Sequence, residues 1–189
     1  MIDRLCDQAR DGDIAVAGLY CDFLTWREQT TTNIMGAILK QLVGRGDIPK
    51  DVHEAFQKGK RVFGGREPLL VDLMRMLRIA IAPFPRVFIC IDGLDECLPE
   101  NLPGLLQSLR DIVQESPKAR IFLTGRPHVG RAIQRYFARV VVIPISPNTD
   151  DIREYLERRL NSDPKPPEAM DDDLRADVRR TILDKMSDM

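Results

Sequence analysis

The hydrophobic and polar positions of this chain follow two alternating patterns. Short runs of consecutive apolar residues predict strands that are buried on both faces of a sheet. These runs occupy residues 14–23, 86–92, 119–124 and 139–145. Between them, apolar residues recur three and four positions apart, which predicts helices. The helical pattern covers residues 1–10, 34–42, 49–62, 69–81, 105–113, 129–137, 149–160 and 174–182.

Strands that alternate with helices predict an α/β fold with a parallel sheet and right-handed crossover connections. Residues at the helix ends agree with these elements. Residues 30–33 supply capping residues before one helix, and Gly44 ends that helix. Pro68 suits the first turn of another helix, and Thr149 opens a helix whose first turn is acidic.

Prolines near the C-terminus indicate a division of the chain. Pro164, Pro166 and Pro167 lie close together between two helical patterns, as in a short linker. We therefore predict one α/β domain over residues 1–161. Residues 162–189 then hold the linker and the start of a C-terminal helical region.

The composition excludes several classes of protein. The 189 residues are 43% hydrophobic, and 28 basic against 29 acidic residues give a net charge of −1. This balance argues against a nucleic-acid binder and against a polybasic membrane patch. No apolar stretch is long enough to span a bilayer, and no signal peptide opens the chain. We expect a soluble, cytoplasmic protein.

The four cysteines form no CxxC pair, and two of them lie in apolar runs that predict strands. They are Cys6, Cys21, Cys90 and Cys97. We interpret them as small buried apolar residues of a protein in a reducing compartment.

The strongest chemical motif is the segment VFICIDGLDE, residues 87–96. Ligands of parallel α/β sheets gather at the carboxyl ends of the strands, which is where this strand delivers Asp92. A carboxylate there can hold Mg²⁺, which prefers oxygen ligands. Asp95 or Glu96 can then polarise a water molecule that attacks a γ-phosphate. The alternative is an ordinary strand that ends in an acidic turn capping the next helix.

A second motif, FLTGRP, follows the next predicted strand at residues 122–127. Thr124 and Arg126 should therefore project from the same edge of the sheet as the acidic motif. An arginine at this edge can sense or neutralise phosphate charge. The alternative is a surface turn with a solvated arginine.

These motifs and their spacing resemble the NACHT family, signalling NTPases of the STAND class that include fungal, NLR-like and nephrocystin-3-like modules. The segment 88–97 (FICIDGLDEC) is similar to the family's Walker B motif, and residues 121–127 (IFLTGRP) are similar to its sensor 1 segment. The resemblance implies that Asp92 is the Mg²⁺ acid and that Asp95 and Glu96 are catalytic or switching acids. It implies that Thr124 and Arg126 contact the nucleotide.

The resemblance further implies a three-layer P-loop NTPase fold, a parallel sheet flanked by helices, with residues 1–161 as a partial nucleotide-binding domain. The Walker A loop, GxxxxGK(S/T), is absent from the sequence. We therefore expect a fragment that begins inside the helix after this loop. In similar NTPases the strand before the loop separates the strands that correspond to 119–124 and 139–145, so the sheet should be incomplete.

Two functions are compatible with these patterns. The first is a fragment of a nucleotide-dependent switch that uses Mg²⁺ and ATP or GTP when complete and binds neither tightly alone. The second is a non-catalytic fragment that binds a longer relative or a partner. The expected partners are other domains of a longer parent protein or a second copy of the chain. A metal-dependent nuclease or phosphatase is disfavoured, because no second acidic cluster or histidine completes such a site.

Overall fold

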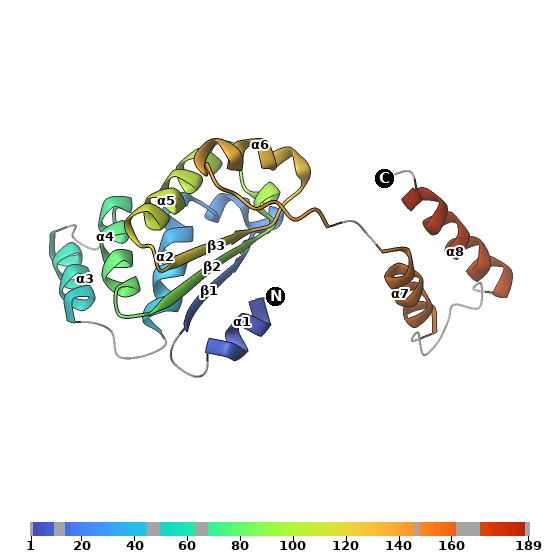
Figure 1. The fold of residues 1–189 in the computed structure, drawn as a ribbon, viewed down its shortest axis with the longest axis horizontal. Coiled ribbons are helices and arrows are strands. Elements are labelled where there is room, and N and C mark those ends of the chain that lie inside the picture. The colour runs from blue at the N-terminus through green and yellow to red at the C-terminus, as the bar shows by residue number, and fades with distance from the viewer. Residues whose placement is uncertain are drawn as a thin grey trace. The chain divides into compact units, whose positions relative to one another are not determined.

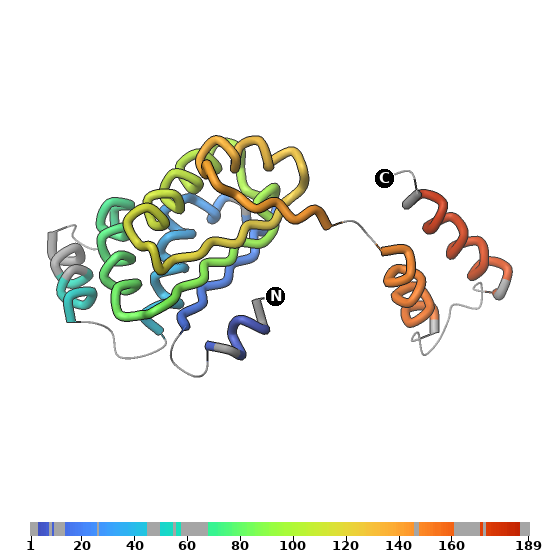
Figure 2. Tube along the Cα trace, viewed as in Figure 1, coloured from blue at the N-terminus to red at the C-terminus, as the bar shows by residue number. Residues whose placement is uncertain are grey.

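The computed structural model of the chain describes residues 2–9, 14–44, 50–62, 68–145, 148–161 and 171–187. Figure 1 shows the elements as a ribbon, and Figure 2 traces the same path as a tube. The chain divides into two units, residues 1–140 and residues 141–189. The first unit contains the sheet and both chemical motifs.

The sheet of the first unit has three strands: β1 (Ile14–Tyr20), β2 (Arg86–Asp92) and β3 (Ala119–Leu123). Their order is β1-β2-β3, and both pairs are parallel, which confirms the predicted α/β class. Tyr20 lies opposite Asp92, and Ile91 lies opposite Leu123. All three strands therefore end at the same edge.

Helices cover one face of the sheet and form the core with it (Figure 1). They are α2 (Thr31–Val43), α4 (Leu70–Ile81) and α5 (Leu102–Glu115). Alternate residues of a strand point to opposite faces, so β2 sends Val87, Ile89 and Ile91 into this core. The largest fully buried side chains are Met35, Ile38, Leu42, Met76, Leu77, Ile81, Ile89, Ile91, Leu94, Leu105, Leu106 and Leu109.

The opposite face of the sheet is covered less completely. The short helix α1 (Ile2–Gln8) contacts β1, and Val16 and Cys90 are buried on this face. Phe88 and Phe122 pack against each other there, with ring centroids 6.1 Å apart, and both remain partly exposed. Two further helices belong to the first unit: α3 (Lys50–Val62), beside α4, and α6 (Pro127–Tyr136), beside α5.

Several predicted boundaries differ from the observed ones by one to three residues, and two of them have a clear local cause. The first strand ends at Tyr20 rather than at residue 23, because the Asp22 side chain accepts a hydrogen bond from Leu24 N (2.9 Å) and starts the 3₁₀ segment η2 (Phe23–Glu28). Helix α4 begins at Leu70, so Pro68 precedes it instead of standing in its first turn. Of the predicted capping residues at 30–33, Thr30 caps the helix, since its side chain accepts a hydrogen bond from Asn33 N.

The predicted strand at residues 139–145 is wrong. This segment carries no strand, and Val141 and Ile143 are 86% and 75% exposed. A strand needs the backbone hydrogen bonds of a neighbour, and no described residue pairs with this segment. Within the described residues, β3 likewise pairs on one side only, with β2. The apolar pattern predicted a strand here, but the neighbour that the family resemblance places between this segment and β3 is not among the described residues. The expectation of an incomplete sheet is therefore confirmed.

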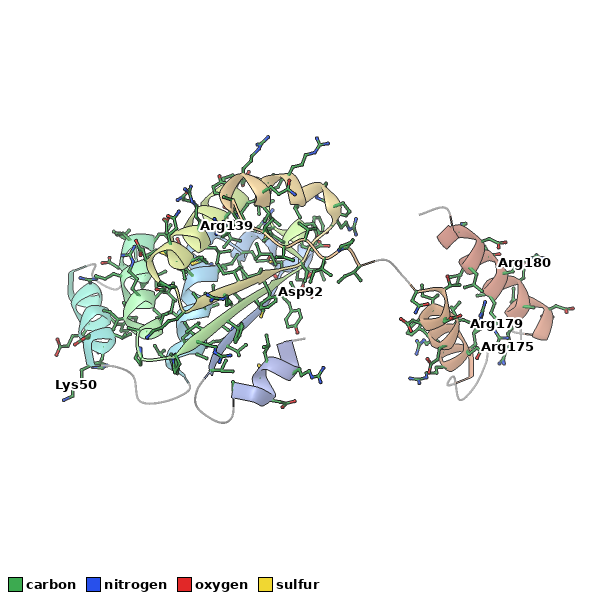
Figure 3. All side chains as sticks on the ribbon, viewed as in Figure 1. Lys50, Asp92, Arg139, Arg175, Arg179 and Arg180 are labelled. Atoms are coloured by element: carbon green, nitrogen blue, oxygen red, sulfur yellow. The ribbon has the colours of Figure 1, made fainter. Side chains whose placement is uncertain are left out.

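The second unit contains α7 (Thr149–Asn161) and α8 (Asp172–Ser187), which contact each other. Asn148 caps α7 through its side-chain oxygen, which accepts from Asp150 N at 2.9 Å. Arg175 and Arg179 lie on the side of α8 that faces α7 (Figure 3). The predicted linker prolines fall at residues outside the described ranges. Among the described helices, none combines the length and apolarity needed to cross a membrane.

Candidate functional site

The acidic motif forms a tight turn at the carboxyl end of β2. Asp92 ends the strand, as labelled in Figure 3, and Gly93 follows with φ 70° and ψ 41°, in the left-handed region. A Cβ atom on Gly93 would lie 3.2 Å from the carbonyl oxygen of Cys21, so this position favours glycine in two ways. The 3₁₀ turn η3 (Leu94–Glu96) comes next, anchored by the fully buried Leu94.

Thr124 joins the end of β3 to this turn. Its hydroxyl donates to Asp92 Oδ1 and accepts from the backbone N–H of Gly93 at 3.0 Å. Its carbonyl accepts from Leu94 N at 2.9 Å, and its own N–H donates to Ile91 O at 3.0 Å. These bonds fix the direction of the Asp92 carboxylate, so the two predicted motifs meet at one edge of the sheet.

Arg126 lies against Asp95. The Asp95 carboxylate accepts from the backbone N–H of Arg126 at 3.2 Å, and its other oxygen lies 3.2 Å from Arg126 Nε. The Asp95 side chain is 10% exposed, whereas that of Arg126 is 75% exposed. Arg126 is therefore accessible to other anions, whereas the nearly buried Asp95 carboxylate would lose its cation if Arg126 left and would retain the hydrogen bond from the Arg126 backbone N–H.

Glu96 is the least constrained of the three acids. Its backbone N–H donates to Gly93 O at 2.8 Å, which closes the turn, and its side chain is partly buried. Within the part of the chain that the structure describes, its carboxylate has neither a hydrogen bond nor an ion pair. The predicted site residues Asp92, Asp95, Thr124 and Arg126 are thus brought together in pairs, with Glu96 on the same turn.

The sequence model of the family described as "Nephrocystin 3, N-terminal" matches residues 1–126, two thirds of the chain. The chain belongs to the nephrocystin-3 N-terminal family. No curated protein matches it. The matched region contains the whole three-stranded sheet and ends at Arg126, so it includes the acidic motif and all of the second motif except its last residue, Pro127.

The nephrocystin-3 family domain also holds a pair of thiols that the sequence did not indicate. Cys21 Sγ and Cys97 Sγ lie 3.1 Å apart, beside the acidic turn. The hydrogen bond between them raises the pKa of Cys21 far above its ordinary value and lowers that of Cys97, against the opposing effect of burial. The two cysteines are 76 positions apart, so their spacing in the sequence does not indicate that they are neighbours. The sequence offered one hint: Cys21 follows β1 and Cys97 follows the turn after β2, and both strands end at the same edge of the sheet.

The donor set at this edge of the family domain suits Mg²⁺ better than it suits phosphate. Asp92 offers a carboxylate, and Mg²⁺ commonly takes one or two carboxylates and retains water. No group of three or more His, Cys, Asp or Glu side chains converges on a metal position among the described residues. The nearby cation, Arg126, is engaged by Asp95. Asp92 thus offers one carboxylate that could bind a hydrated Mg²⁺, and the residues at this edge do not by themselves form a phosphate cradle.

Proposed function

We propose that this chain is part of a NACHT-type nucleotide-dependent switch and supplies its acidic rim, while the phosphate-binding loop is not encoded in this sequence. The supporting observation is the hydrogen bond from the Thr124 hydroxyl to Asp92. It joins the ends of two neighbouring parallel strands at the edge where α/β proteins bind ligands. The Asp95–Arg126 pair at the same edge supplies an exchangeable cation.

Each residue has a distinct task in this proposal. Asp92 would hold a hydrated Mg²⁺, with its carboxylate oriented by Thr124, and the metal would neutralise charge on the phosphates. Arg126 exchanges the Asp95 carboxylate for phosphate oxygens, which are its other preferred partners. Asp95 thereby loses its cation, and Glu96 is free to orient the attacking water. The loss of the Asp95–Arg126 pair couples nucleotide binding to the shape of the turn.

The missing loop determines what the chain does alone. A Walker A loop contributes backbone N–H groups, a lysine and a hydroxyl to the phosphates and metal. Hydrogen bonds to charged groups contribute about 1.5–3 kcal/mol each, so losing three weakens binding by about 4.5 kcal/mol or more. Since each 1.4 kcal/mol is tenfold, a micromolar Kd becomes about millimolar or weaker.

Calorimetry on two proteins tests this proposal. The chain alone should give no measurable heat with Mg²⁺-ATP at micromolar concentrations. A chimera that places the glycine-rich loop, strand and helix of a complete family member before Met1 should bind Mg²⁺-ATP. Asp92→Asn should weaken that binding at least about tenfold, because it removes one charge-assisted metal contact. Asp173→Asn, an exposed carboxylate on α8, is the matched control.

The results separate the proposal's two parts. Tight Mg²⁺-dependent binding by the chain alone, abolished in Asp92→Ala, would show that the loop is dispensable. A folded chimera that binds no nucleotide, or one that Asp92→Asn leaves unaffected, would refute the acidic rim's role.

An interaction fragment is the second candidate function. It is favoured by an exposed apolar segment within residues 140–145, whose members are Val140, Val141, Val142, Ile143 and Ile145. Exposed contiguous apolar surface often marks a binding site, here for another domain of a longer parent or a second copy. Light scattering over a range of concentrations tests self-association directly. A strictly monomeric chain would remove the second copy as a partner.

A further inference from the structure

Two cysteines that have no part in the proposed nucleotide chemistry meet beside the acidic turn. Cys21 follows β1, and Cys97 follows η3, so they come from separate elements 76 positions apart. Their sulfurs are 3.1 Å apart, about 1 Å beyond the ~2.05 Å length of a disulfide bond. Cys97 is 6% exposed, and Cys21 is more accessible.

The backbone holds this pair in place independently of the sulfur atoms. Cys21 N donates to Asp92 O at 2.8 Å, which continues the β1–β2 hydrogen bonding by one residue. Cys97 N donates to Leu94 O at 3.3 Å and closes η3. A third group, the Gln29 side-chain oxygen, lies 4.0 Å from the Cys97 sulfur and can accept its S–H. Because both main chains are fixed by these bonds, the thiols stay close without a covalent link.

We propose that Cys21 and Cys97 form a redox-active dithiol, a modification site that hydrogen peroxide converts into an intramolecular disulfide. One sulfur, as thiolate, attacks a peroxide oxygen; the O–O bond breaks and the released hydroxide takes up a proton to become water. The sulfur is now a sulfenic acid. The second thiol attacks this sulfur and loses its proton, the S–O bond breaks, and a second water leaves. Two thiols and one peroxide thus give one disulfide and two waters.

The position of the disulfide gives it a specific effect. It would tie the end of β1 to the residue directly after Glu96. The turn that carries Asp95 and Glu96 would then be held at both ends, at Asp92 by the sheet and at Cys97 by the new bond. Oxidation therefore restricts the motion of the acidic turn. The disulfide forms without bound nucleotide, since only the two thiols and the peroxide react.

Mass spectrometry of the full chain tests the proposal. The folded chain is treated with hydrogen peroxide, its remaining thiols are alkylated, and it is digested without reduction. We expect loss of two hydrogens from the intact mass and a linked peptide pair that joins Cys21 to Cys97. Alkylation of both cysteines should fall about tenfold compared with the reduced chain and recover with dithiothreitol.

Variants separate this pair from the other thiols. Cys6→Ser combined with Cys90→Ala retains the pair and should still form the disulfide. Cys97→Ser should abolish it, and its circular dichroism checks that the fold persists. Oxidation in urea removes the geometric preference and should yield mixed pairings. The proposal is refuted if folded protein gives equally mixed pairings, or if the two cysteines become sulfinic or sulfonic acids without a disulfide.

Discussion

Thr124→Val isolates the hydrogen bonds that join the two motifs. Valine keeps the branched shape of threonine but has no hydroxyl. The change removes a hydrogen bond to the Asp92 carboxylate, which contributes about 1.5–3 kcal/mol, and leaves the Gly93 N–H without its acceptor. Thr124 is partly exposed, so water can replace part of the loss. We expect the free energy of unfolding to fall by about 2–3 kcal/mol.

Urea unfolding followed by circular dichroism measures this loss. With a slope of about 1–3 kcal/mol per molar urea, the midpoint should fall by about 1 M. Thr124→Ser retains the hydroxyl and should cost less than about 1 kcal/mol. A double-mutant cycle with Asp92→Ala should give a coupling energy of about 1–2 kcal/mol, since the two groups are in contact. Additive losses, or equal effects of Thr124→Val and Thr124→Ser, would refute the reasoning.

Two further predictions concern backbone and surface. Gly93→Ala should lower the free energy of unfolding by about 1–2 kcal/mol, because a non-glycine residue is strained at φ 70° and its Cβ meets Cys21 O. Gly130, on α6, is the control, because a Cβ atom there would meet open space. Gly130→Ala should raise the free energy of unfolding by about 0.5–1 kcal/mol. An equal response of both glycines in urea unfolding would contradict this account. Val141→Ser and Ile143→Ser should each change the free energy of unfolding by less than about 0.5 kcal/mol, because both side chains are exposed. Together they should raise solubility in a precipitation assay. A larger loss of stability would mean that these side chains are buried in solution.

The parts of the fold that the sequence predicted well are those set by local patterns. The strand β2 was predicted with its observed bounds, Arg86–Asp92, because a run of apolar residues lies between Pro85 and an acidic turn. Helix α2 was predicted from its apolar spacing and from Thr30, whose side chain caps it. In both cases the information lies within about ten residues of the element. The segment 139–145 has an equally clear apolar run, but its state depends on a distant neighbour, which no local pattern reports.

The site shows the same distinction between local and distant information. The rule that ligands gather at strand carboxyl ends placed Asp92 and Arg126 at one edge, and the structure has them there. The rule could not assign partners. The Thr124 hydroxyl bonds to Asp92 because β3 lies directly beside β2, and Asp95 faces Arg126 because Gly93 reverses the chain. Such pairings depend on the register between strands and on side-chain direction, which the sequence does not encode locally.

The unequal environments of the three acids argue for a division of tasks among them. Three carboxylates on one turn repel one another, and their surroundings differ. Asp95 is neutralised by a cation, Asp92 is oriented by a hydroxyl, and Glu96 has neither form of support among the described residues. The Thr124 hydrogen bonds stabilise the turn, and they also fix the direction of the Asp92 carboxylate. In the proposed function, Asp92 would bind the metal, Asp95 would hold Arg126 until a nucleotide is present, and Glu96 would orient water.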